Sequence, residues 1–97
     1  MTQHTIMAVL ESYPGKENAL KEALLAVVEP SRREEANIEY RLHQSKENAC
    51  QFILYENWAS QAEHLQQFEK PYILDLVEKT QGLLAKPYQI YTADEIV

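Results

Sequence analysis

The order of hydrophobic and polar residues predicts a strand and then a helix at the start of the chain. A strand over residues 5–13 has apolar side chains on both of its faces, as in a strand that is covered on two sides. Residues 16–28 carry apolar side chains at steps of three and four, which is typical of an amphipathic helix. We expect Pro30 to end this helix, because a proline disfavours the helical conformation in the residue before it.

Two further alternating segments predict a β-hairpin. Residues 38–43 alternate between apolar and polar side chains and predict a half-buried strand, and residues 50–58 predict the next one. The polar residues 44–49 between them suit a turn. In the second strand, one face carries Phe52, Leu54, Glu56 and Trp58, and the other carries Ile53 and Tyr55. A lone carboxylate among these side chains is notable, because burying an unpaired charge is unfavourable.

A second helical region follows the hairpin. Ser60 and Glu63 have the spacing of a capping box, in which the serine caps the helix. Pro71 interrupts the region and suits the first turn of a second helical segment, which is expected to end near Gly82. The side chains expected to face the core are Ala62, Leu65, Phe68, Ile73, Leu74, Leu76 and Val77. Residues 88–92 predict a last strand.

The resulting order of elements, β-α-β-β-α-β, predicts an α+β, ferredoxin-like fold with an antiparallel sheet. Helices then cover one face of the sheet, yet the first and third strands offer apolar side chains to the other face as well. A chain of 97 residues predicts one domain over 1–97, and the expected cover for the second face is another copy of the chain. The sequence therefore predicts a homodimer that packs through its sheets.

Composition narrows the classes of partner. The formal net charge is −6, so an anionic duplex or membrane surface would be repelled, and no nucleic-acid or membrane partner is expected. The apolar runs are too short to span a bilayer, and the first residues lack the regions of a signal peptide, so we expect a cytoplasmic protein. Cys50 is the single cysteine, which excludes an intrachain disulfide. The three histidines have no local metal-ligand spacing, so no metal site is expected.

Several short motifs in order resemble one known family. They are Pro14-Gly15-Lys16, Pro30-Ser31-Arg32 with Glu35, Tyr40 with Leu42-His43, Leu54-Tyr55-Glu56-Asn57-Trp58-Ala59-Ser60, Pro71 and Leu83-Leu84-Ala85-Lys86-Pro87. Together they cover nearly the whole chain, which resembles the antibiotic biosynthesis monooxygenase domain family of the dimeric α+β barrel superfamily. The resemblance implies a dimer of ferredoxin-like subunits.

The resemblance also implies a range of activities. Members of the family oxygenate quinol-like or polycyclic aromatic substrates without flavin, haem or metal, so no cofactor is expected here. A related member isomerises a phosphorylated sugar derivative. Three hypotheses follow: a monooxygenase of a small quinol-like or polyphenolic substrate, a non-catalytic dimer that binds a small ligand, and an isomerase of a small carbonyl compound.

The sequence departs from the family pattern at two histidine positions. Gln67 and Tyr72 stand where members often have histidine, and the nearby His64 lies three residues before Gln67. A neutral amide does not transfer protons at neutral pH, although it can orient a ligand. The departure favours a mechanism without those histidines, or a protein that only binds its ligand.

Glu56 is the candidate catalytic residue, as a general base whose pKa is raised by apolar surroundings. The alternative is a structural carboxylate that ties its strand to a helix N-terminus or to a basic partner. The candidate substrate-binding residues are Trp58, Tyr40, Gln67, Tyr72 and His64. Each also has a structural interpretation: core packing for the aromatic residues, a surface position for Gln67, and a solvent-facing position for His64, which has polar neighbours.

Overall fold

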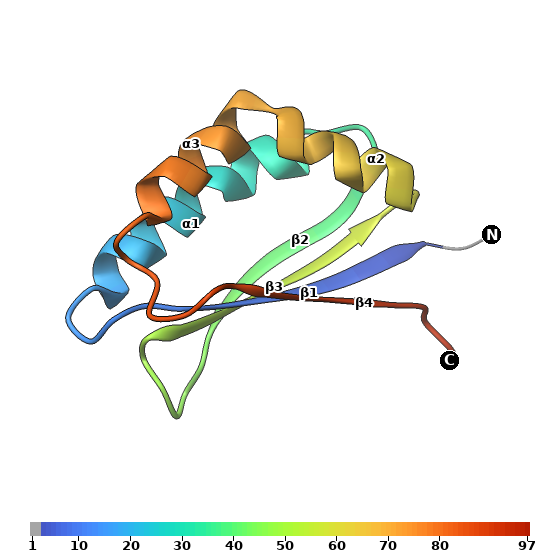
Figure 1. Cartoon of the computed structure of the whole chain (residues 1–97). Helices are drawn as coiled ribbons and strands as arrows, with labels where there is room; N and C mark the ends of the chain where they lie inside the picture. Colours follow the sequence, from blue (N-terminus) through green and yellow to red (C-terminus); the bar gives the residue numbers. More distant parts are fainter. Residues whose placement is uncertain (1–2) are drawn as a thin grey trace.

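The computed structural model describes residues 3–97, which form one antiparallel sheet with helices on one of its faces (Figure 1). The elements are β1 His4–Glu11, α1 Glu17–Arg32, β2 Asn37–Gln44, β3 Gln51–Trp58, α2 Gln61–Gln66, the 3₁₀ helix η1 Gln67–Glu69, α3 Pro71–Thr80 and β4 Gln89–Ala93. The strand order is β2-β3-β1-β4, and every neighbouring pair is antiparallel. The predicted ferredoxin-like α+β fold is confirmed.

The register of the central strands decides which side chains face the helices. In β3, all four residues predicted to share a face are buried, including Glu56 and Trp58. β1 pairs Ile6 with Glu56, so the carboxylate lies beside an aliphatic side chain in the middle of the sheet. The buried hydrophobic cluster is formed by Ile6, Ala8, Leu10, Leu20, Leu24, Val27, Val28, Tyr40, Phe52, Leu54, Trp58 and Ile73.

Pro30 does not end α1, contrary to expectation. The helix continues through Pro30 to Arg32, and the backbone N–H of Arg33 still donates to the carbonyl of Glu29 at 3.1 Å. A proline in the last turn removes only one hydrogen bond, and the tertiary contacts of the extra turn oppose that loss. The extra turn buries Ser31 completely, and Arg32 Nε donates to the carbonyl of Tyr40 at 2.9 Å.

The second helical region faces the sheet with different residues from those expected. The predicted cap is confirmed, since the N–H of Glu63 donates to Ser60 Oγ at 3.2 Å. However, His64 and Gln67 are buried, whereas Ala62 and Leu65 are exposed. Phe68 does point to the inner side, where it packs against His64, but it remains 38% exposed. The region breaks into α2, η1 and α3. Because the region is not one continuous helix, a single helical periodicity does not predict which of its residues face the sheet. The inner positions are taken by polar side chains that interact with other parts of the fold.

In α3, the prediction holds for half of the apolar residues. Pro71 begins the helix, Ile73 is buried and Leu76 is partly buried, as expected. Leu74 and Val77, which were expected in the core, are 57% and 50% exposed. A helix of ten residues that packs on one side presents only about one side chain per turn to the core. Leu74 therefore faces outward, whereas Val77 lies at the edge of the inner face and lines the space between helix and sheet.

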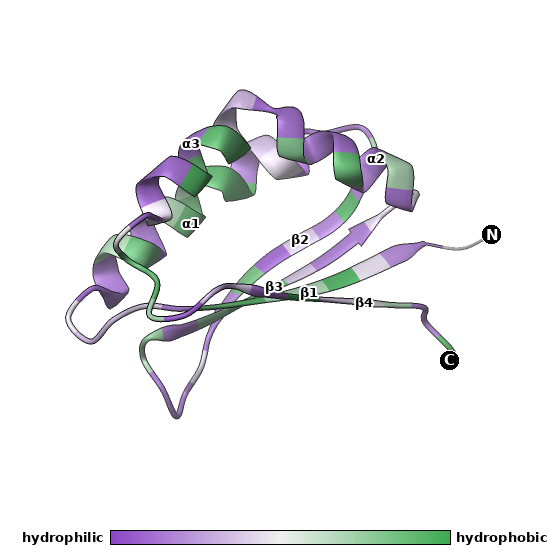
Figure 2. Ribbon diagram, in the orientation of Figure 1, coloured by the Kyte–Doolittle hydropathy of each residue, from purple (hydrophilic) through white to green (hydrophobic). Residues whose placement is uncertain are grey.

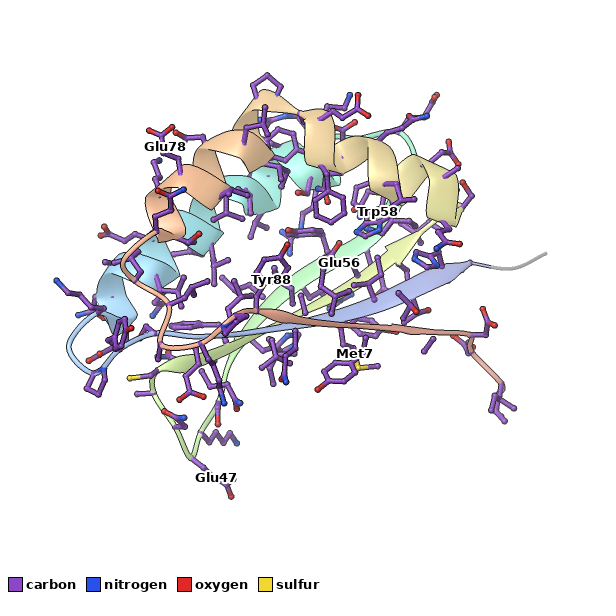
Figure 3. The ribbon with its side chains drawn as sticks, in the orientation of Figure 1. Met7, Glu47, Glu56, Trp58, Glu78 and Tyr88 are labelled. Atoms are coloured by element: carbon purple, nitrogen blue, oxygen red, sulfur yellow. The ribbon has the colours of Figure 1, made fainter. Side chains whose placement is uncertain are left out.

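The face of the sheet opposite the helices carries an exposed apolar surface, as predicted. Met7 points away from the helices (Figure 3) and is 40% exposed, and Tyr91 of β4 is also exposed. Val9, Ile53 and Tyr55 are only half-buried. We call these five residues the outer sheet surface. Figure 2 shows hydrophobic residues along β1 as well as on the helices above it.

Among residues 3–97, no helix is both long enough and apolar enough to cross a membrane.

Candidate functional site

A cavity of about 80 Å³ lies between the sheet and the helices. Its apolar lining comes from Ile6, Ala8, Leu10, Leu24, Leu54, Phe68, Ile73, Leu76, Val77 and Ile90. Polar groups are contributed by Tyr40, Glu56, His64, Gln67, Thr80 and Tyr88. This volume holds several water molecules or part of a small ligand, and it is smaller than the 300–1,000 Å³ of typical ligand pockets. A larger ligand therefore has to open the cavity or extend out of it.

The cavity opens between the helices and the edge strand β4. Phe68, Val77, Tyr88 and Ile90 line the cavity and are also exposed, so we call them the rim. Figure 3 shows Tyr88 and Glu56 in the space between the sheet and the helices. An apolar rim is suited to the entry of a flat, apolar ligand, because contact with the ligand removes both surfaces from water.

Glu56 is the buried acid of the cavity, and β3 holds it in place. Its carboxylate Oε1 accepts a hydrogen bond of 2.9 Å from Nε1 of Trp58, two residues along the same face of the strand. No described residue donates a hydrogen bond to Oε2. Glu56 is 4% exposed, and its burial raises the pKa of the carboxyl group to about 7, against a smaller lowering by Trp58. Near neutral pH, therefore, Glu56 is able both to accept and to release a proton.

His64 lies beside Glu56 and not in solvent, so its predicted solvent-facing position is wrong. Its Nε2 is 3.8 Å from Glu56 Oε1, and the residue is 5% exposed. Its ring packs against the rings of His4, Trp58 and Phe68, with centroids 5.2–5.5 Å apart. Burial, with a smaller effect of His4, lowers the pKa of His64 to about 4. Between these two pKa values the pair is neutral, and Glu56 holds the proton.

Gln67 joins the cavity to a polar network at the end of α1. Its Nε2 donates to Ser31 Oγ at 2.8 Å and to Tyr72 Oη at 3.2 Å, and Tyr72 Oη donates to Glu34 Oε2 at 3.0 Å. Tyr72 has a single hydroxyl proton, which goes to Glu34, so its oxygen has to accept from the amide nitrogen of Gln67. This requirement sets the orientation of the amide. The Gln67 carbonyl oxygen has no partner among the described residues and is available to a ligand.

The two tyrosine candidates have different positions. Tyr40 lines the cavity, and its burial, reinforced by the charge of Glu56, raises the pKa of its hydroxyl, which therefore remains a proton donor. Tyr72 lies behind Gln67 and is not part of the cavity lining. Trp58 likewise holds Glu56 from behind. Of the six predicted site residues, the structure thus gathers Glu56, Tyr40, Gln67 and His64 around the cavity.

Sequence reasoning missed the rim and the pairing of His64 with Glu56. The spacing of three residues between His64 and Gln67 places both on one helical face, and this was the available indication that His64 faces inward with Gln67. Within residues 3–97, no group of three or more His, Cys, Asp or Glu side chains is placed to hold a metal ion. The chemistry that the described residues offer is proton transfer in an apolar cavity.

Residues 3–79 match the family model for antibiotic biosynthesis monooxygenase, which spans more than half of the chain. The chain belongs to the antibiotic biosynthesis monooxygenase family. A relative from Synechocystis, the uncharacterised protein sll1783, is 36% identical over 63 residues, which are 65% of this chain and 43% of the relative. The match thus spans less than half the length of that curated relative.

Solved structures of similar proteins support the fold of this family member. PA3566 from Pseudomonas aeruginosa has a TM-score of 0.95 and 27% sequence identity, over 100% of this chain and 97% of the other. Rv0793 from Mycobacterium tuberculosis has a TM-score of 0.91 and 21% identity, over 98% of this chain and 96% of the other. At this level of identity, the likeness to Rv0793 shows the fold alone.

Proposed function

We propose that this protein is a cofactor-independent monooxygenase of a small quinol-like or polyphenolic aromatic substrate, with Glu56 as the general base. One observation carries the proposal. A buried carboxyl group whose pKa is about 7 lies in an apolar cavity with Oε2 available. A general base is most effective when its pKa is near the working pH, and burial gives Glu56 that property. Membership of the monooxygenase family supports the same reading.

The proposed reaction begins with transfer of a hydroxyl proton from the bound quinol to Glu56 Oε2. The resulting anion is electron-rich and reduces dioxygen directly. One oxygen atom forms a bond to a ring carbon, which loses its hydrogen, and the ring is oxidised to a hydroxyquinone. The second oxygen atom leaves as water with the two remaining hydrogen atoms. Quinol and dioxygen are thus converted to hydroxyquinone and water, and Glu56 ends the cycle as it began.

The other cavity residues would orient the substrate. The hydroxyl of Tyr40 remains protonated and donates hydrogen bonds, whereas the carbonyl oxygen of Gln67 accepts them. The apolar walls exclude water from the anion, so the electrons are delivered to dioxygen in a medium of low polarity. The apolar rim would hold the part of the substrate that extends beyond the cavity.

The test is oxygen uptake with a panel of hydroquinones, for the wild-type protein and for Glu56→Gln. Glu78→Gln is the matched control, because Glu78 is exposed on α3 and points to solvent (Figure 3). We expect uptake above autoxidation for the wild type and Glu78→Gln, and a loss of about a hundredfold or more for Glu56→Gln. Uptake in the wild type no faster than autoxidation would contradict the proposal.

Binding without oxygen uptake would instead support a non-catalytic dimer that binds a small ligand. The structural basis for this second candidate is Gln67, whose amide is held by hydrogen bonds to Ser31 and Tyr72. The resemblance described above implies that family members often have a histidine at this position, and an amide does not replace a histidine in proton transfer. Titration of a redox-inert resorcinol, followed by tryptophan fluorescence, distinguishes the outcomes. An isomerase would show exchange of a carbonyl substrate's α-hydrogen with solvent, without oxygen uptake.

We also propose that the chain forms a homodimer through the outer sheet surface. The proposal is supported by the exposed Met7 and Tyr91 on a face of the sheet that no helix within residues 3–97 covers. Light scattering should give about twice the 11.3 kDa of one chain, and Met7→Lys should shift the mass toward one chain. Leu25→Lys, on the exposed side of α1, is the control. A wild-type mass of one chain at micromolar concentration would contradict a dimer.

A further inference from the structure

A substrate that fills the cavity separates the carboxyl group of Glu56 from solvent. The carboxyl is buried, and the cavity is its route to the exposed rim. Once substrate occupies that route, the proton taken by Oε2 has no way to solvent on that side. Within one turnover, Glu56 would accept first the hydroxyl proton and later the proton of the ring carbon, so it has to release the first while the cavity is occupied. A proton returns for the departing water, so the overall reaction releases no net proton. The other oxygen, Oε1, accepts from Trp58 and lies 3.8 Å from Nε2 of His64.

His64 and then His4 lie one after the other between Oε1 of Glu56 and the surface. His64 Nε2 approaches Glu56 Oε1 at 3.8 Å, and the ring of His4 lies 5.5 Å from that of His64 between centroids. His64 lines the cavity, whereas His4 does not; it is partly exposed at the first residue of β1. α2 and the start of β1 lie at the same end of the molecule (Figure 1). The three side chains therefore lead from the buried base to the surface.

We propose that His64 and His4 form a proton relay that connects Glu56 to solvent while the cavity is occupied. A neutral imidazole accepts a proton at one nitrogen and releases one from the other. Rotation of the carboxyl group brings the proton taken at Oε2 to the side of His64. The proton then passes to His64 Nε2, and the proton already on His64 Nδ1 leaves toward His4 and water. A movement of about 1 Å brings Oε1 and Nε2 into hydrogen-bond range. The relay rests on the proposed role of Glu56 as the base.

The surroundings favour a relay of neutral groups. Glu56 is faced by Tyr40 from β2, His64 from α2 and Tyr88 across the cavity, and no charged residue of α1 or α3 lines the cavity. His64 is faced by His4 from β1 and by Phe68 from η1. With burial opposing charge on both groups, the imidazole is uncharged near neutral pH and can exchange its two tautomers without becoming an ion.

The tautomer of His64 tests the first step without any substrate. We would record ¹⁵N spectra of the histidine rings from about pH 5.5 to about pH 8.5, a range that spans the titration of Glu56. Protonated Glu56 donates to Nε2 and selects the Nδ1–H form, whereas ionised Glu56 selects the Nε2–H form. We expect His64 to change tautomer with a midpoint near pH 7 in the wild type, and to keep one tautomer throughout in Glu56→Gln. One tautomer throughout in the wild type would overturn the relay.

The second step is tested by rescue. With His64→Ala, oxygen uptake should fall about tenfold or more and should be restored by added imidazole. His4→Asn should make the rate depend on buffer concentration. Loss of activity that imidazole does not restore would overturn the relay, as would a His4→Asn rate independent of buffer. If the wild type shows no oxygen uptake but His64 changes tautomer, the proposed function fails while the connection between Glu56 and His64 stands.

Discussion

Replacing Glu56 with Gln should stabilise the protein at alkaline pH. In the folded protein, burial raises the pKa of Glu56 from 4.5 to about 7. The protonated carboxyl is therefore favoured on folding. Glu56 contributes full stability below pH 4.5, and this contribution is lost as the pH rises through 7. Gln resembles the protonated form in shape and never becomes charged, so the variant avoids this loss.

The magnitude follows from the two pKa values. A separation of about 2.5 between them corresponds to about 3 kcal/mol, at about 1.36 kcal/mol for each pKa unit. The free energy of unfolding of Glu56→Gln, relative to the wild type, should thus rise by about 3 kcal/mol between pH 4.5 and pH 8. For a domain of this size, that corresponds to about 12–24 °C in Tm.

The free energy of unfolding of the variant has to be compared with that of the wild type at each pH, because His64 also makes stability depend on pH. Burial lowers its pKa from 6.5 to about 4, so its contribution to stability is present above pH 6.5 and is lost as the pH falls through 4. In the wild type, the two residues thus change stability in opposite directions between pH 4.5 and pH 6.5. The difference between wild type and variant removes the His64 contribution and leaves that of Glu56.

The assay is urea unfolding at a series of pH values, with protein concentration held constant because association would change the apparent stability. Glu78→Gln, at an exposed position, should track the wild type at every pH. A difference between Glu56→Gln and wild type that does not vary with pH would refute the reasoning. So would a variant that loses stability relative to the wild type as the pH rises.

Three further substitutions test the cavity. Trp58→Phe removes the hydrogen bond to Glu56, so the pKa of Glu56 should rise above 7, and the midpoint of the rate against pH should move in the alkaline direction. Gln67→Leu leaves the buried hydroxyl of Ser31 without its hydrogen-bond partner and should lower the free energy of unfolding by about 1–3 kcal/mol. Gln66→Leu, at an exposed position, is the control and should have little effect in urea unfolding. Phe68→Ala removes part of the rim and should raise KM with a smaller effect on kcat; an unchanged KM would exclude Phe68 from substrate contact.

The strands were predictable because their pattern has a period of two. Once Phe52 and Leu54 face the core, alternation leaves Glu56 and Trp58 no other direction. The inward position of the candidate base could therefore be read from the sequence. The capping box at Ser60 and the helix start at Pro71 were predictable for a similar reason, since both depend on neighbours within a few residues.

The second helical region was less predictable. In a short helix, the local pattern does not decide which side an apolar residue takes, and here it favoured Ala62 and Leu65 over His64 and Gln67 for the inner side. The polar residues are inside because partners from other elements satisfy them. For Gln67 this partner is Ser31, 36 positions earlier and on the turn that follows Pro30. The local sequence also does not show that α1 continues past Pro30, because contacts with residues far away in the chain stabilise that extra turn.

The sequence by itself determined the order of the elements, the inner face of the sheet and the presence of a carboxylate on that face, because these depend on periodicity and nearest neighbours. Only the tertiary structure decided what surrounds the carboxylate. It placed His64 3.8 Å from Glu56, brought Gln67 to the same cavity and left Tyr72 behind it. These relations depend on how three helical segments dock on the sheet, and docking is set by the combined packing of residues far apart in the chain. The raised pKa of Glu56 is therefore a property of the assembled fold.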